Sequence, residues 1–92
     1  MCHIDDSHAG EHVSAFRAAA RRFCAGHATE TFYLAADGMG ADGFRMSVRR
    51  RHETECPIVA VLGDDAERSI FSAMEQWWEG RRQAWHAHGA GL

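Results

Sequence analysis

Residues 44–51 read Phe-Arg-Met-Ser-Val-Arg-Arg-Arg, and apolar and polar side chains alternate along this stretch. Successive side chains of a β-strand point to opposite faces of a sheet, so this pattern predicts a strand with one buried side. The apolar side chains are predicted to face a core, and the polar ones to line an open sheet face rich in arginine. The core-facing positions are Phe44, Met46 and Val48, and the open-face positions are Arg45, Ser47, Arg49 and Arg51.

Two further segments are predicted to complete the sheet. Residues 29–36 contain Thr, Phe, Tyr and Leu, which favour a strand. Residues 58–62 read Ile-Val-Ala-Val-Leu and follow Pro57, which a strand tolerates at its first position. Residues 37–43 read Asp-Gly-Met-Gly-Ala-Asp-Gly and are expected to form the turn that joins the first two strands.

A helix is predicted on each side of the strands. From Glu11 to Ala25 the apolar residues fall on one helical stripe, and Gly26 suits the position after a helix end. A second helix is expected to start at Asp64 as N-cap, with Glu67 completing an approximate capping box, and to run to about His86. The order α-β-β-β-α predicts an α+β fold, with a three-stranded antiparallel sheet and both helices packed on one face.

The length and composition indicate one folded domain over residues 1–92. The chain is 46% hydrophobic and 25% charged, which are ordinary globular values. Residues 1–10 are expected to be a loose N-terminal segment and residues 87–92 a frayed tail. No apolar run approaches the ~18 residues of a membrane helix, and the N-terminus lacks the regions of a secretory signal. These features predict a cytoplasmic protein without a membrane partner.

The three cysteines, Cys2, Cys24 and Cys56, are odd in number and widely spaced. This pattern predicts reduced thiols, as in the cytosol, and not a disulfide framework. The chain has no lysine, which excludes Schiff-base and P-loop chemistry. Its formal net charge of −3 gives no overall attraction to nucleic acid.

None of the motifs with a known chemistry stands in its required context. Gly38, Gly40 and Gly43 have the spacing of a dinucleotide fingerprint, but a strand follows them instead of a helix, so they are interpreted as turn glycines. None of the seven histidines has the spacing of a zinc motif, so no metal and no cofactor is predicted. Cys56 lies near His52, but no third group is available to orient such a pair. No catalytic residue is therefore assigned.

The arginine-lined face is the main functional hypothesis. Arginines at an interface pair with acidic groups, and exposed aromatic side chains anchor protein partners. The favoured function is a non-enzymatic module that binds a protein partner, with a homodimer as another use of the same face. The predicted partner-binding residues are Arg45, Arg49, Arg51 and Tyr33, together with one of Trp77 and Trp78.

Two other classes of function stay open. The same face is suited to nucleic acid, but three phosphate contacts give a salt slope of only about −3, which corresponds to weak binding. The third class is a small metal-dependent or thiol enzyme. A small lysine-free domain without a recognisable site is what we expect from a phage or mobile element, where it would inhibit a host complex as anti-CRISPR proteins do.

Overall fold

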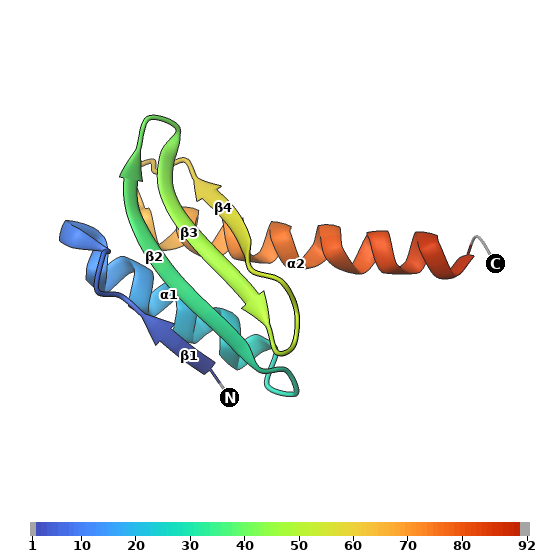
Figure 1. Cartoon of the computed structure of the whole chain (residues 1–92). Helices are drawn as coiled ribbons and strands as arrows, with labels where there is room; N and C mark the ends of the chain where they lie inside the picture. Colours follow the sequence, from blue (N-terminus) through green and yellow to red (C-terminus); the bar gives the residue numbers. More distant parts are fainter. Residues whose placement is uncertain (1, 91–92) are drawn as a thin grey trace.

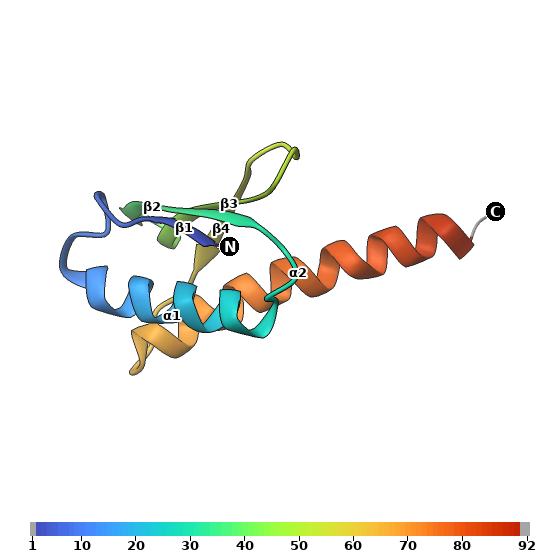
Figure 2. The ribbon, with the colours of Figure 1, turned by 90° about the horizontal axis from the view of Figure 1, so that it is seen from below.

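The computed structural model describes residues 2–90, with side chains described as far as Arg82. The chain forms two layers, a sheet and a pair of helices, with α1 and α2 on the same side of the sheet (Figures 1 and 2). The elements in chain order are β1 (Cys2–Asp5), a 3₁₀ turn η1 (Gly10–His12), α1 (Val13–Gly26), β2 (Phe32–Gly40), β3 (Gly43–Arg50), β4 (Cys56–Ala60) and α2 (Ala66–Ala90).

The sheet has four strands in the order β1-β2-β3-β4. β2, β3 and β4 are antiparallel neighbours, but β1 runs parallel to β2, with Cys2 opposite Phe32. The α+β class is therefore confirmed, whereas the three-stranded antiparallel sheet is wrong. The extra strand lies within residues 1–10, which were expected to be loose. Two parallel strands need a crossover connection, and α1 supplies it.

A disulfide joins Cys2 of β1 to Cys24 near the end of α1, with their Cα atoms 6.1 Å apart. The prediction of three reduced thiols is thus wrong for two of them, and Cys56 alone is free. The bond ties the edge strand to the helix beneath it. The cytosol was inferred from three reduced thiols, so with this disulfide the cysteines no longer support that location.

The hairpin between β2 and β3 is tighter than the sequence suggests. β2 continues to Gly40, so the loop consists of Ala41 and Asp42 and does not span the expected residues 37–43. Gly43 has φ +140, and a Cβ atom there would come within 2.5 Å of the Ala60 carbonyl oxygen. Only glycine fits this position, because it combines a positive φ with a close approach of β4.

The core lies between the sheet and the helices. Phe44, Met46 and Val48 are buried, so the alternation predicted for this strand is confirmed. Burial of large apolar side chains is the main stabilising contribution to folding. The other large buried side chains are Phe16 and Phe23 of α1, Phe32 and Leu34 of β2, and Ile70 and Met74 of α2.

The last helix begins one residue later and ends later than expected. The backbone N–H of Arg68 donates to Oδ1 of Asp65 at 3.1 Å, so Asp65, not Asp64, caps α2. The helix runs to Ala90, so residues 87–90 of the expected tail are helical, while residues 91–92 lie outside the described part. Its second half continues past the β4 side of the sheet (Figure 1). None of the helices within residues 2–90 is long and apolar enough to cross a membrane.

An ion cluster closes the end of the core where the β3–β4 connection meets α2. Arg50 donates from Nε and Nη2 to Oε1 of Glu53, at 3.1 and 2.6 Å, and Arg81 of α2 contacts Oε2 of the same carboxylate. The Arg50 guanidinium lies 5.7 Å from the ring of Trp78, and that of Arg81 lies 5.7 Å from the ring of Trp77. The two cations thus cover the tryptophans at this edge of the core.

This cluster gives the stability a pH dependence. Burial by itself would raise the pKa of Glu53, but hydrogen bonds from Arg81 and Arg50 outweigh it and hold the pKa below its ordinary value of 4.5. A carboxyl group with a lowered folded-state pKa contributes stability above the unfolded pKa, and this contribution is lost as the pH falls through the folded pKa.

We therefore expect Glu53→Gln to lower the free energy of unfolding by about 1–2 kcal/mol at neutral pH and to make that energy less sensitive to acid. Urea unfolding at about pH 6 and about pH 3 measures both effects. Glu55→Gln, which removes a neighbouring exposed carboxylate, is the matched control. Equal acid sensitivity of the wild type and Glu53→Gln would contradict the role given to the cluster.

Candidate functional site

The side of the sheet that faces away from α1 and α2 is not covered by any other element of residues 2–90 (Figure 2). We call this side the open sheet face. Its residues alternate along each strand with those that point into the core. The face is made of His3 and Asp5 of β1, Tyr33 and Ala35 of β2, Arg45, Ser47 and Arg49 of β3, and Pro57 and Val59 of β4.

One row across the open sheet face is already ordered. His3, Tyr33 and Arg49 are opposite one another on β1, β2 and β3. The His3 ring stacks on Tyr33 with centroids 4.4 Å apart and an angle of 6°, and the Arg49 guanidinium lies 4.1 Å from the Tyr33 centroid. Because β1 and β3 flank β2 on opposite sides, Tyr33 is held between the two. We call these three residues the Tyr33 row.

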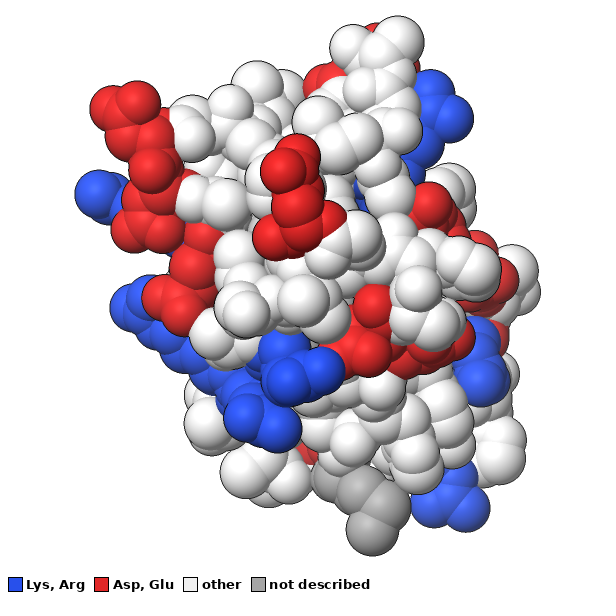
Figure 3. All heavy atoms as spheres, turned by 90° about the vertical axis from the view of Figure 1, so that its left-hand side faces the viewer, with Lys and Arg blue, Asp and Glu red and all other residues white. Residues whose placement is uncertain are grey.

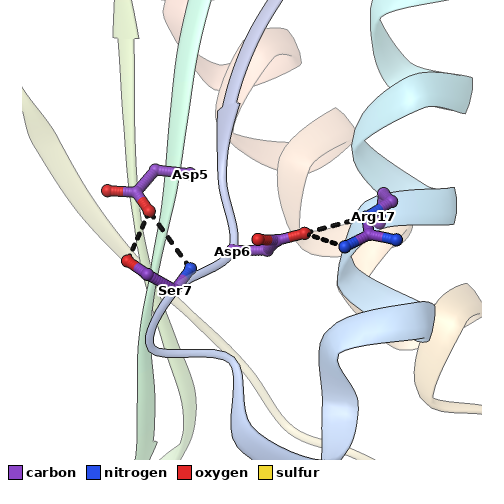
Figure 4. A network of polar contacts seen from close by, with 4 residues as sticks. All are labelled: Asp5, Asp6, Ser7 and Arg17. Atoms are coloured by element: carbon purple, nitrogen blue, oxygen red, sulfur yellow. Dashed lines mark hydrogen bonds and ion pairs between the residues drawn. The ribbon is translucent and has the colours of Figure 1, made fainter.

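A shallow pocket of about 220 Å³ lies at the Tyr33 row and also includes Asp5 and Glu55. Asp5 accepts hydrogen bonds from the Ser7 hydroxyl and backbone N–H, at 2.5 and 3.1 Å (Figure 4). The hydroxyl bond is the main reason why the pKa of Asp5 is lowered. The carboxylate is therefore ionised at neutral pH, and the pocket presents both an anion and the Arg49 cation.

The loop after β1 is held in place by a second contact. Nε and Nη2 of Arg17 donate to Oδ2 of Asp6, at 2.8 and 2.6 Å (Figure 4). This two-pronged ion pair fixes the loop to α1. Together with the disulfide it keeps β1, and hence His3, in position beside Tyr33.

The other end of the open sheet face is apolar and cationic. Arg45 lies opposite Val59, and its side chain passes over Gly40, where a Cβ atom would overlap the guanidinium. The apolar residue opposite Arg45 is accessible, since Val59 is 41% exposed. Apolar area next to arginine is typical of the centre of a protein interface.

The structure brings some of the predicted partner-binding residues together and separates others. Tyr33, Arg45 and Arg49 share the open sheet face. Arg51 is exposed just after β3, where its backbone N–H donates to the Thr31 carbonyl at 3.0 Å. Its position continues the alternation of β3 beyond the end of the strand.

Trp77 and Trp78 lie on α2, on the other side of the sheet from the arginine face. Both are half-buried against the core, with ring centroids 6.1 Å apart. They therefore do not share a surface with the open sheet face. His3 is the residue of the site that sequence reasoning missed, because its position depends on the pairing of β1 with β2.

The charge around the site is mixed. From the β1 side of the molecule, acidic and basic side chains lie next to one another in several places, with uncharged surface between these mixed groups (Figure 3). Close to the site itself, Asp42 lies 4.0 Å from Arg45, and Asp37 accepts a hydrogen bond from Ser47 at 3.1 Å. A continuous surface of one sign, as a nucleic-acid backbone requires, is not formed here.

The described residues provide little for metal or thiol chemistry. Among the described residues, no three His, Cys, Asp or Glu side chains come together in a way that could hold a metal ion. Cys24 is in the disulfide. The half-buried Cys56 thiol donates a hydrogen bond to the Pro57 carbonyl oxygen, with 3.8 Å between sulfur and oxygen.

Comparison with known proteins finds no relative. The sequence matches no protein-family model, and no curated protein and no solved structure matches it. The open sheet face and its surroundings are therefore the basis for inferring function.

Proposed function

We propose that this protein is a non-enzymatic interaction module that binds a protein partner through the open sheet face. The observation that carries the proposal is the Tyr33 row, in which an aromatic ring is stacked between His3 and Arg49. Tyrosine and arginine are enriched among the residues that dominate binding energy. Because these side chains are already ordered, binding costs less conformational entropy than with free side chains.

The rest of the face supports a protein partner over nucleic acid. Val59 adds exposed apolar area beside Arg45, which suits the desolvated centre of a protein interface. Asp5 lines the same pocket as Arg49, and Asp42 lies 4.0 Å from Arg45, so both carboxylates would repel phosphates. A guanidinium stacked on tyrosine also suits a single-stranded base, so nucleic acid is the second candidate.

The narrower role, an anti-CRISPR-like inhibitor encoded by a phage or mobile element, stays a prediction from the sequence, as do the cytoplasmic location and a homodimer. None of them is needed for the test of binding. That test has to separate a protein partner from nucleic acid and the open sheet face from other surfaces.

The expected result is that Arg45→Glu/Arg49→Glu weakens partner binding about 10- to 100-fold. The partner is captured from a lysate of the source cells, purified, and titrated against wild type and variant. Arg21→Glu/Arg82→Glu is the matched control, because it makes the same charge change at two exposed helix positions away from the face. Circular dichroism verifies that both variants fold.

Labelled single-stranded and duplex nucleic acids are titrated in parallel at about 50 mM and about 200 mM salt. A salt slope near −3 that disappears in Arg45→Glu/Arg49→Glu would replace the proposal with the nucleic-acid alternative. Equal loss of partner affinity in both double variants would show that net charge, not the open sheet face, determines binding.

A further inference from the structure

β4 is an edge strand, and within residues 2–90 no strand pairs with its outer side. Pro57 has no N–H, and sheets accommodate proline where its nitrogen faces away from the neighbouring strand. The backbone of Pro57 is therefore placed toward the outer edge, away from β3. Opposed residues of antiparallel strands alternate between hydrogen-bonded and non-hydrogen-bonded pairs. Because the direction of the backbone groups repeats every two residues, the N–H and C=O of Val59 also point to the outer edge.

Pro57 protects only the first half of this edge. A proline on an edge strand blocks pairing with another chain, because it offers no donor. Beyond it, the backbone groups of Val59 remain available, and Val61, just after β4, is 78% exposed. The open part of the edge is thus the half that ends beside the start of α2.

A groove of about 360 Å³ runs along this half of the edge. One wall is the chain from Val59 to Val61, and the other is α2. The α2 side chains near the middle of the groove, Ser69, Ser72 and Ala73, are small, which leaves room beside the strand. α2 continues past the β4 side of the sheet (Figure 1), so a further strand laid against β4 would have a helix beneath it.

We propose that this groove takes an extended segment of a partner protein as a fifth strand of the sheet, with an acidic side chain of that segment facing Arg68. Backbone hydrogen bonds to an exposed sheet edge supply affinity in this mode of recognition, and side-chain pockets supply specificity. Arg68 is the charged residue among those described as lining the groove, and no carboxylate lines it. The charge therefore favours an acidic segment.

A single segment fits this edge better than a second copy of the chain. Edge-to-edge pairing of two copies would bring the second α2 and its core into the space that the projecting half of α2 already occupies (Figures 1 and 2). A lone strand brings no helix with it. The groove shares Val59 with the open sheet face but contains no residue of the Tyr33 row, and it uses the strand edge and α2 instead of the face, so the inference goes beyond the proposed function.

The test uses phage-displayed random peptides of about eight residues, selected on the full chain at near-physiological salt. Affinities of the synthesised peptides are measured by fluorescence anisotropy. Val59→Pro removes the outward N–H without removing a bond to β3, and Ser72→Tyr fills the groove. Both variants are expected to weaken binding at least ~10-fold, whereas the controls Val59→Thr and Ser72→Ala stay within about twofold.

Two further readouts locate the peptide. Arg68→Glu is expected to weaken peptides with an acidic residue about 5- to 10-fold and to leave neutral ones unchanged. Amide hydrogen exchange of Val59 is expected to slow when peptide is bound, because its N–H becomes hydrogen-bonded. If circular dichroism shows that Val59→Pro is unfolded, the proposal is tested by the peptide affinity of Ser72→Tyr and by the amide exchange of Val59.

Different measurements would contradict this inference and the proposed function: peptide affinity tests the groove, and partner affinity tests the open sheet face. Arg45→Glu/Arg49→Glu is expected to keep peptide affinity within about twofold while it loses the partner of the open sheet face. A selection that yields no binder, or peptides that bind Val59→Pro and Ser72→Tyr as well as wild type, would overturn the groove. A dimer in light scattering that Val59→Pro converts to a monomer would show that a second copy holds the edge, and the proposal would be wrong.

Discussion

Replacing Cys2 and Cys24 with serine is expected to lower the free energy of unfolding by about 3 kcal/mol. The disulfide spans a sequence separation of 22, and a crosslink over a loop of this size removes conformational entropy mainly from the unfolded chain. β1 is short and pairs with a single neighbour, so it has few other contacts to replace the bond. Urea unfolding of the oxidised wild type and the double variant measures the difference.

Two controls separate the crosslink from the loss of a thiol. Cys56→Ser changes the free cysteine and is expected to cost less than about 1 kcal/mol. Wild type treated with a reductant should unfold like the double variant. A cost below about 1 kcal/mol for Cys2→Ser/Cys24→Ser would mean that pairing with β2 alone holds β1 in place.

Phe32→Ala is expected to cost about 3–5 kcal/mol, the largest effect of a single substitution proposed here. Phe32 is fully buried at the centre of an aromatic cluster, with centroids 4.8 Å from Phe23 and 5.5 Å from Trp78. Removing the ring leaves a cavity that the neighbouring rings can fill only in part. The loss combines the transfer energy of the ring with the cost of that cavity.

Tyr33→Ala is the matched control, because it removes an aromatic ring at the next position on the opposite face of the same strand. It is expected to cost about 1 kcal/mol, since Tyr33 is only half-buried. Urea unfolding gives both values, and tryptophan fluorescence of Phe32→Ala should shift to the red as Trp78 gains contact with water. A larger cost for Tyr33→Ala than for Phe32→Ala would contradict the assignment of the two faces.

The sequence was informative wherever the structural cause is local. Alternation at Phe44, Met46 and Val48 identified β3 and the direction of its faces, and the same rule placed Arg45 and Arg49 on the open side. The helical stripes identified α1 and α2. The cap of α2 was displaced by one residue, because Asp64 and Asp65 are equally good capping residues and only the backbone geometry distinguishes them.

The features that the sequence did not predict depend on contacts between segments that are distant along the chain. Cys2-His3-Ile4-Asp5 holds a single strongly apolar side chain, Ile4, and its parallel partner begins only at Phe32, so no turn marks the pairing. The disulfide was missed for the same reason, since Cys2 meets Cys24 only once β1 is placed. His3 enters the site by the same pairing.

The tryptophans show a second limit. One of Trp77 and Trp78 was predicted to anchor a partner, but the sequence of α2 does not show which residues cover the two rings. Arg50 and Arg81 come from β3 and α2 and meet over a shared carboxylate, Glu53. A spacing rule applies within one helix, and this cluster is assembled from three parts of the chain.

The crossover from β1 through α1 also has a consequence for synthesis on the ribosome. Cys2 and Cys24 both emerge before β2 and before Cys56, so, of the three cysteines in this sequence, the native pair is the first that an oxidising environment can join. Early pairing would attach the first residues to α1 and leave them positioned for β2 when it arrives. A complete reduced chain that refolds from denaturant has no such order, and there Cys56 competes with both native partners from the start.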